Sequence, residues 1–133
     1  MKLETGICGE QSVRVSAENT AKTMGSGTLD VFATPALVAL AEKTCWQSVA
    51  PALEAGSGTV GTKLDITHDS ATPLGMKVWA EAEITAVSEN GKMVDFAVKA
   101  WDESGPIGSG THTRAIVKNE KFLAKCNAKL EKK

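Results

Sequence analysis

The chain has 133 residues, of which 42% are hydrophobic and 23% charged, and its formal net charge is −1. This predicts a single domain over residues 1–133, and the near-neutral charge gives no argument for a nucleic acid or a membrane surface as partner. The three cysteines are widely spaced and form no CxxC pair, so we expect no bound metal and a reducing cytoplasm. The sequence also shows no signal-peptide core and no run near the ~18 apolar residues of a membrane span.

The first predicted element is a short strand over residues 9–18, where Val13 and Val15 alternate with polar residues. Residues 19–30 are polar and rich in glycine, which predicts a loop. The loop is either a plain connector or a mobile lid over a site.

The segment from Val31 to Ala50 predicts a central helix. Pro35 suits the first helical position, and Thr34 before it suits the N-cap. Residues 36–41 are apolar on every side, which is typical of a helix enclosed by the rest of the protein. Glu42 follows directly, and a carboxylate in such surroundings needs a partner.

After the helix, the period of the hydrophobic pattern changes to two. In residues 60–68 the count places five side chains on one face: Val60, Thr62, Leu64, Ile66 and His68. Residues 76–87 alternate more regularly, and Asn90-Gly91 predicts a two-residue hairpin turn with positive φ at both positions. The next strand continues the inner face with Val94, Phe96, Val98 and Ala100.

The last strand is predicted over residues 107–117, and residues 118–130 read as a basic helix. Its expected anchoring side chains are Phe122, Leu123 and Cys126. Because each later strand has one apolar face, we predict an antiparallel sheet that covers the helix. The fold class is therefore α+β: a hot-dog fold, with the sheet wrapped around a long central helix.

Three side chains then stand out as candidate catalytic groups. Thr34 and Glu42 are eight residues apart, which separates them by roughly 80° around the helix and by ~12 Å along it. Strand alternation points His68 at the same interior, and a carboxylate beside a histidine raises the imidazole pKa and fixes its tautomer for general base catalysis. Structural alternatives are open for each: Thr34 as a helix cap, Glu42 as an acid bound by backbone or subunit groups, and His68 as a core histidine.

The last strand contributes two further polar groups. Alternation places His112 and Arg114 on the face of Gly108 and Gly110, and we expect His112 to be structural rather than catalytic. Seven Lys/Arg from Arg114 onward form either a solvated helix face and tail or a basic rim for an anionic ligand. They are Arg114, Lys118, Lys121, Lys125, Lys129, Lys132 and Lys133.

Three segments in order carry a family resemblance. They are Val31-Phe-Ala-Thr-Pro35 continuing through Leu40-Ala-Glu42, then Gly61-Thr-Lys-Leu-Asp-Ile-Thr-His-Asp-Ser-Ala-Thr-Pro73, and Ile107-Gly-Ser-Gly-Thr-His-Thr-Arg-Ala-Ile116. They resemble the central helix, the next strand and turn, and the last strand of the fluoroacetyl-CoA thioesterase family of hot-dog proteins. The resemblance runs from about Val31 to Phe122.

The resemblance implies that Thr34, Glu42 and His68 form the catalytic group and that Gly61 lies close to the acyl group of the substrate. It also implies a homodimer that binds acyl-CoA near the subunit interface, with no cofactor beyond the coenzyme A of the substrate. To these we add Phe32 and Arg114 as candidate substrate contacts.

The sequence departs from the fluoroacetyl enzyme just before the helix. That enzyme has a lid there with aromatic residues, which helps it to select fluorine, whereas residues 25–30 here contain none. We therefore predict an acyl-CoA thioesterase for a short or medium acyl group. The alternatives are a non-catalytic acyl-CoA binding domain and a hot-dog enoyl-CoA hydratase.

Overall fold

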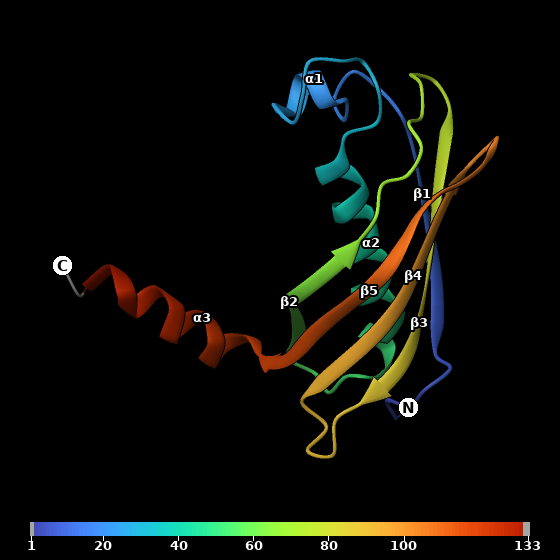
Figure 1. Ribbon diagram of the computed structural model, residues 1–133. Coiled ribbons are helices and arrows are strands. Elements are labelled where there is room, and N and C mark those ends of the chain that lie inside the picture. Colours follow the sequence, from blue (N-terminus) through green and yellow to red (C-terminus); the bar gives the residue numbers. More distant parts are fainter. Residues whose placement is uncertain (1, 132–133) are drawn as a thin grey trace.

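A five-stranded antiparallel sheet curves around one long helix in this computed structural model, which describes residues 2–131 (Figure 1). Lys132 and Lys133 of the basic run lie outside the described residues. The strands are β1 (Cys8–Arg14), β2 (Ser57–Ile66), β3 (Lys77–Val87), β4 (Met93–Asp102) and β5 (Gly105–Lys118), in the sheet order β1-β3-β4-β5-β2. The helices are α1 (Ala21–Met24), α2 (Thr34–Val49) and α3 (Asn119–Asn127), with 3₁₀ turns η1 (Ala50–Ala52) and η2 (Ala128–Glu131). The α+β prediction is confirmed.

The core lies between α2 and the concave face of the sheet. The buried strand residues are those that the alternation predicted: Val78, Ala80, Ala82 and Ile84 on β3, and Val94, Phe96, Val98 and Ala100 on β4. The facing side chains of α2 are Leu37, Leu40, Ala41, Cys45 and Val49. Each fully buried Val, Leu, Ile or Phe among them contributes roughly 1.5–3 kcal/mol, so this layer fixes the helix on the sheet.

The opposite side of α2 is open. Ala39, Lys43 and Trp46 are exposed, and Trp46 has 43% of its surface accessible. The prediction that the chain itself encloses the helix on every side is therefore wrong. The apolar run is broader than one sheet can cover, so part of it faces outward in the single chain.

The first strand and the start of α2 also differ from the prediction. β1 ends at Arg14 because the Asn19 side chain accepts the N–H of Ser16 at 2.8 Å and closes a turn. Thr34 is the first residue of α2 rather than its cap, because Ala33 occupies the N-cap position and has no side chain that could bond there. The Thr34 hydroxyl is thereby left for another partner.

Residues 19–30 contain a helical turn within the predicted loop. Thr20 caps α1 by accepting the N–H of Thr23, and Gly25 ends it in the left-handed region at φ 72°. Val31 and Phe32 then pair with Pro73 and Thr20 in isolated bridges. The segment before α2 is thus attached to the loop after His68.

The β3–β4 connection is longer than the predicted two-residue turn. Gly91 has φ 71°, but Asn90 does not have a positive φ. The Asn90 and Ser88 side chains instead accept the N–H groups of Lys92 and Met93. These side-chain bonds replace the type I′ geometry, and the turn prediction is wrong in that detail.

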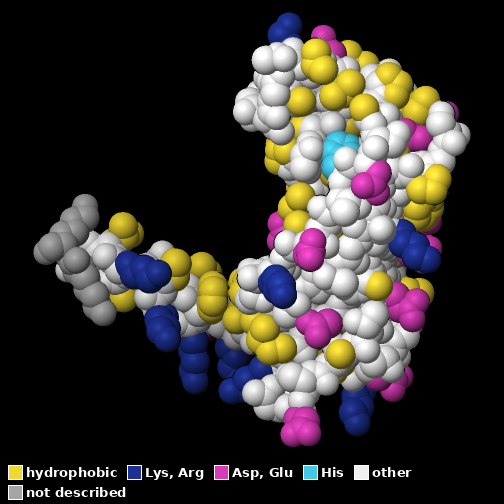
Figure 2. Space-filling model, in the orientation of Figure 1, with side chains coloured by type: hydrophobic (Ala, Val, Ile, Leu, Met, Phe, Trp, Pro, Cys, Tyr) yellow, Lys and Arg dark blue, Asp and Glu magenta, His cyan; other side chains and the backbone are white. Residues whose placement is uncertain are grey.

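The C-terminal helix α3 projects away from the sheet (Figure 1). The side chains that were expected to anchor it are exposed: Phe122 is 41% and Leu123 is 57% exposed, and Cys126 is exposed as well. Figure 2 shows hydrophobic and basic side chains along this projecting arm. The predicted basic helix is present, but no surface among residues 2–131 covers the side chains of Phe122 and Leu123.

Candidate functional site

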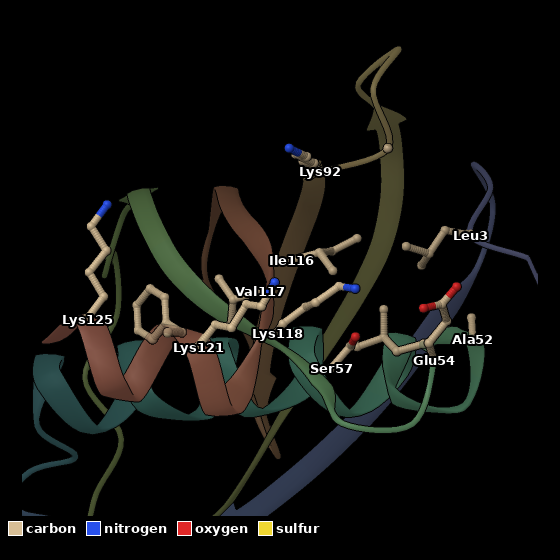
Figure 3. Close-up of a pocket in the computed structure, with 13 residues that line it drawn as sticks. Leu3, Ala52, Glu54, Ser57, Lys92, Ile116, Val117, Lys118, Lys121 and Lys125 are labelled. Carbon is tan, nitrogen blue, oxygen red and sulfur yellow. The ribbon is translucent and has the colours of Figure 1, made fainter. Parts of the chain in front are cut away.

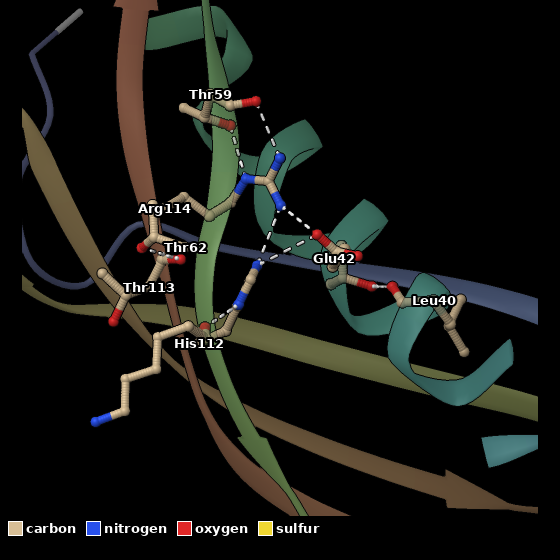
Figure 4. A network of polar contacts seen from close by, with 9 residues as sticks. Leu40, Glu42, Thr59, Thr62, His112, Thr113 and Arg114 are labelled. Carbon is tan, nitrogen blue, oxygen red and sulfur yellow. Dashed lines mark hydrogen bonds and ion pairs between the residues drawn. The ribbon is translucent and has the colours of Figure 1, made fainter. Parts of the chain in front are cut away.

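The partner of Glu42 is the guanidinium of Arg114 on β5. Arg114 Nη1 donates to Glu42 Oε2 at 3.0 Å, and the same nitrogen lies 3.1 Å from His112 Nε2 (Figure 4). Arg114 Nε and Nη2 donate to the hydroxyl and the carbonyl of Thr59 at 2.8 and 3.0 Å. These contacts engage Nη1, Nη2 and Nε of one buried guanidinium and thereby fix its orientation. We call Glu42, Thr59, His112 and Arg114 the Glu42 network.

The tautomer of His112 follows from its two contacts. Nδ1 lies 2.7 Å from the carbonyl oxygen of Lys63, which can only accept, so Nδ1 carries the hydrogen. Nε2 is then the acceptor for Arg114 Nη1. Burial lowers the pKa of His112, with Arg114 also lowering it. His112 is therefore a neutral acceptor at neutral pH, 3.9 Å from the Glu42 carboxylate.

Gly61 makes the room that Glu42 occupies. A Cβ at this position would lie 2.6 Å from Glu42 Oε2 and 3.2 Å from His112 Cε1. Gly61 faces inward because β2 carries a bulge: Gly61 pairs with Arg114 and Lys63 with Thr113, which leaves Thr62 as the extra residue. The prediction of one uninterrupted face through Val60, Thr62 and Leu64 is wrong because the bulge shifts the alternation by one residue.

His68 is paired with Thr34. Thr34 Oγ1 and His68 Nδ1 are 2.8 Å apart, and the Phe32 ring stands edge-on to the imidazole at 6.5 Å. Burial lowers the pKa of His68, although Asp69 and Ser70 act in the opposite direction. His68 Nε2 is buried and has no hydrogen-bond partner among residues 2–131, and it lies next to a cavity of about 180 Å³ that Thr34 and Phe32 help to line.

The loop that carries His68 is anchored from two sides. The Thr72 hydroxyl donates to Asp102 Oδ2 at 2.7 Å, and both residues are buried. The Thr72 carbonyl accepts the N–H of Phe32 at 2.9 Å. Thr72 therefore connects the loop that carries His68 to the end of β4 and to the segment before α2.

The three predicted catalytic residues form two separate groups in the chain. The carboxylate of Glu42 bonds to Arg114, and its side chain is 40% exposed rather than buried. Thr34 and His68 lie about two helical turns away, ~12 Å along α2. The expectation that Glu42 raises the pKa of His68 is therefore wrong within one chain.

His112 and Thr59 are contacts of the site that the sequence did not identify as such. His112 was expected to be structural, yet it touches both Arg114 and the carboxylate. Its alternation with Arg114 on an inward face was the available signal. The sequence around Thr59 gave no such signal, because a threonine in a strand with glycines is compatible with many structural roles.

Comparison with known proteins decides the family. A profile of the fluoroacetyl-CoA-specific thioesterase family matches residues 15–120. The fluoroacetyl-CoA thioesterase of Streptantibioticus cattleyicolor is 44% identical over 100 residues, which are 75% of this chain and 70% of that protein. The chain belongs to the fluoroacetyl-CoA-specific thioesterase family. This confirms the resemblance seen in the sequence.

Solved structures agree with the family assignment. A fluoroacetyl-CoA thioesterase structure superposes with a TM-score of 0.91 at 35% identity, covering 97% of this chain and 98% of that one. A thioesterase superfamily member from Thermus thermophilus superposes with a TM-score of 0.88 at 25% identity, covering 97% and 94%. Membership in this thioesterase family and the hot-dog fold support acyl-CoA thioester hydrolysis by this chain.

Three further features concern metal binding, thiol reactivity and membrane spans. Among residues 2–131, no cluster of three or more His, Cys, Asp or Glu side chains could hold a metal ion. Burial raises the pKa of the Cys45 thiol to about 12, so this cysteine beside the Glu42 network is a poor nucleophile at neutral pH. No helix in the same range is long and apolar enough to cross a membrane.

Proposed function

We propose that the protein hydrolyses a short or medium acyl-CoA to the free acid and coenzyme A. The observation that carries the proposal is the Glu42 carboxylate, fixed by Arg114 against the backbone of Gly61 and left 40% exposed. Such a carboxylate is oriented yet accessible to a thioester. No cofactor other than the coenzyme A of the substrate takes part.

Each candidate residue has a distinct role in this proposal. Glu42 acts as general base toward water or as the nucleophile that forms a mixed anhydride. His68, whose Nδ1 is bonded to the Thr34 hydroxyl, transfers a proton through Nε2, which has no hydrogen-bond partner among residues 2–131. The start of α2 has no side-chain cap, so its first-turn N–H groups are suited to stabilising the oxyanion.

The active site is assembled from two copies of the chain in a homodimer. Within one chain, the Glu42 network and the Thr34–His68 pair are ~12 Å apart along α2, which is too far for one reacting carbonyl to contact both. The exposed side of α2, with Ala39 and Trp46, is the surface on which a second copy would pack. A two-fold axis there would bring Glu42 of each copy toward the Thr34–His68 pair of the other.

The acyl group is short or medium in length because little space adjoins His68. The cavity beside Thr34 has about 180 Å³, and Phe32, which is 1% exposed, forms part of its wall. Residues 25–30 bring no aromatic residue over it. We place the protein in the cytoplasm, where acyl-CoA is made and where its three cysteines would stay reduced.

The direct test is thiol release from a panel of acyl-CoA thioesters, from acetyl to decanoyl with branched, aromatic and halogenated members. Wild type should release coenzyme A from at least one short or medium substrate, and His68→Ala should lose most of that rate. Conversion of an added enoyl-CoA into the 3-hydroxyacyl-CoA with the thioester intact would identify a hydratase. Tight binding without turnover across the panel would identify a binding domain.

Mixing two inactive variants tests the shared active site. In a mixed dimer of His68→Ala and Glu42→Gln, one of the two sites regains both groups if they come from different copies. Random mixing should then restore about a quarter of the wild-type activity. If both groups come from one chain, the mixture will be no more active than its parents, and the shared site is wrong.

A further inference from the structure

Asp102, the last residue of β4, is a buried carboxylate that the proposed mechanism does not use. It is 6% exposed, and among residues 2–131 it forms no ion pair. The basic side chains around the pocket beside α3 lie at the other end of the sheet (Figure 3). Lys92 precedes β4 and Lys118 ends β5, whereas Asp102 ends β4 beside the start of β5. Hydrogen bonds alone therefore compensate the cost of burying this side chain.

Three donors bind the Asp102 carboxylate. Oδ1 accepts the N–H groups of Ser104 and Gly105 at 2.8 and 3.2 Å, and Oδ2 accepts the hydroxyl of Thr72 at 2.7 Å. Burial raises the pKa of Asp102, but the bonds lower it by more, so the pKa lies below its ordinary value and the side chain is ionised at neutral pH.

The bonds to Ser104 and Gly105 belong to the turn between β4 and β5, where aspartate commonly binds the backbone that follows it. The bond to Thr72 has no part in that turn, because Thr72 is 30 residues away in the chain. The burial of Asp102 therefore serves a contact with a different loop.

Thr72 follows His68 in the same loop and is fully buried. Its carbonyl accepts the N–H of Phe32, two residues before Thr34. The bond from Thr72 to Asp102 thus attaches both the loop that carries His68 and the segment that leads to Thr34 to the end of β4.

The other end of the loop is attached by backbone bonds. The N–H groups of Thr67 and Asp69 donate to carbonyl groups of β5 and its start at 2.9 and 2.7 Å. His68 lies between these two donors, and Asp102 restrains the loop beyond them. The place of the imidazole depends on both attachments, and a side-chain substitution can remove the one at Asp102.

We propose that Asp102 is a positioning residue of the active site: through Thr72 it holds the imidazole of His68 at hydrogen-bonding distance from Thr34. The consequence for catalysis rests on the proposed thioesterase function. Thr34 Oγ1 and His68 Nδ1 are 2.8 Å apart, so a shift of the loop by about 1 Å would break their bond. A misplacement of this size lowers the rate of an enzyme by up to about 100-fold.

The pKa of His68 reports the place of its ring. Burial lowers this pKa, whereas the charge of Asp69 and the backbone of Ser70 raise it. Apart from Asp69, the described side chains around the cavity beside His68 carry no charge. A loosened loop would admit water to the ring, so the pKa should rise toward its ordinary value of 6.5.

The test compares Asp102→Asn, Thr72→Val and Thr72→Ser with wild type. In Asp102→Asn the amide oxygen still accepts the two turn N–H groups, but the amide nitrogen cannot accept the Thr72 hydroxyl. Thr72→Val removes this hydroxyl and keeps the branched shape, whereas Thr72→Ser keeps the hydroxyl. Thr44→Val is the matched control: Thr44 is 1% exposed, and its hydroxyl donates to the Leu40 carbonyl within α2, away from the loop.

NMR titration of the imidazoles and steady-state thiol release are measured for each variant. In Asp102→Asn and Thr72→Val, the pKa of His68 should rise toward 6.5 and kcat should fall about 10- to 100-fold with little change in KM. His112, the other of the two histidines, lies in the Glu42 network and should keep its pKa.

Thr72→Ser should match wild type in both measurements, and Thr44→Val should lose stability without moving either. Asp102→Asn and Thr72→Val break the same contact. Combining them should therefore lower kcat no further than Thr72→Val does alone.

A His68 pKa that keeps its wild-type value in Asp102→Asn and Thr72→Val would overturn the positioning role, even if kcat falls, because Asp102 would then act elsewhere. The same rise in Thr44→Val would overturn it as well, since loss of stability alone would then explain the change.

The titration separates this inference from the thioesterase proposal. If wild type hydrolyses no thioester but the two substitutions still raise the pKa of His68, the positioning role stands and the thioesterase proposal fails. If wild type hydrolyses acyl-CoA and neither substitution changes the His68 pKa or kcat, the positioning role fails alone.

Discussion

The guanidinium of Arg114 and the carboxylate of Glu42 meet at 3.0 Å although they are 72 residues apart in the chain. Arg114 is 6% exposed and is also bound by Thr59 and His112. The fixed guanidinium therefore sets the orientation of the Glu42 carboxylate. The carboxylate keeps its other side open. Catalysis by Glu42 is therefore expected to depend on how Arg114 is held, and not only on Glu42 itself.

Glu42→Gln should keep the fold and lower kcat by at least about 100-fold, because the amide retains the shape of the side chain but is neither a base nor a nucleophile. Circular dichroism and steady-state thiol release measure the two quantities. Glu81→Gln, the same change at an exposed position of β3, should leave both unchanged. A Glu42→Gln enzyme with the wild-type rate would remove Glu42 from the catalytic group.

Gly61→Ala should reduce turnover with little loss of stability. The new Cβ would lie 2.6 Å from Glu42 Oε2, so the partly exposed carboxylate must move away from its position against β2. Thermal unfolding and kcat of the variant check this, with the exposed Asp65→Asn on the same strand as control. Full activity in Gly61→Ala would mean that the observed carboxylate position is not the reactive one.

Arg114→Lys should lower both stability and kcat even though the charge is kept. A lysine cannot reproduce the bonds to Glu42, His112 and the two oxygens of Thr59 at once. Leaving the buried His112 Nε2 and the partly buried oxygens of Thr59 without this donor should cost about 2–3 kcal/mol of unfolding free energy. Urea unfolding measures this cost, and a lysine variant as stable as wild type would show that the bonds to Thr59 and His112 are weak.

Acid should destabilise the protein through its histidines. Burial lowers the pKa of both His68 and His112 below the ordinary value of 6.5, so below that pH the unfolded chain binds protons that the folded chain does not. The free energy of unfolding should therefore fall as the pH drops from about 6.5 and level off below the folded pKa values.

Urea midpoints across this range measure the effect, and His68→Gln should make the slope shallower. If neutral His68 is the active form, the wild-type rate should fall as the pH drops through the lowered pKa of His68. A stability that rises on acidification through this range would contradict the neutral state of both rings.

The sequence by itself determined the layers of the molecule. Alternation from Val78 to Ile84 and from Val94 to Ala100 predicted the inner face of the sheet, and the apolar run after Pro35 predicted the helix that it covers. These signals are local, because each depends only on the period of side chains along one element. The family resemblance pointed to Thr34, Glu42 and His68, whose catalytic roles stay predictions.

Only the tertiary structure decided which polar groups meet. The bulge at Thr62 turned Gly61 inward, and this made the space in which Glu42 lies beside His112 and Arg114. A helix rise of 1.5 Å per residue kept the Glu42 network away from the Thr34–His68 pair, so the fold of one chain leaves them apart. Contacts between distant segments depend on strand register, on bulges and on the relative position of packed elements. None of these three can be predicted from the spacing of residues along the chain.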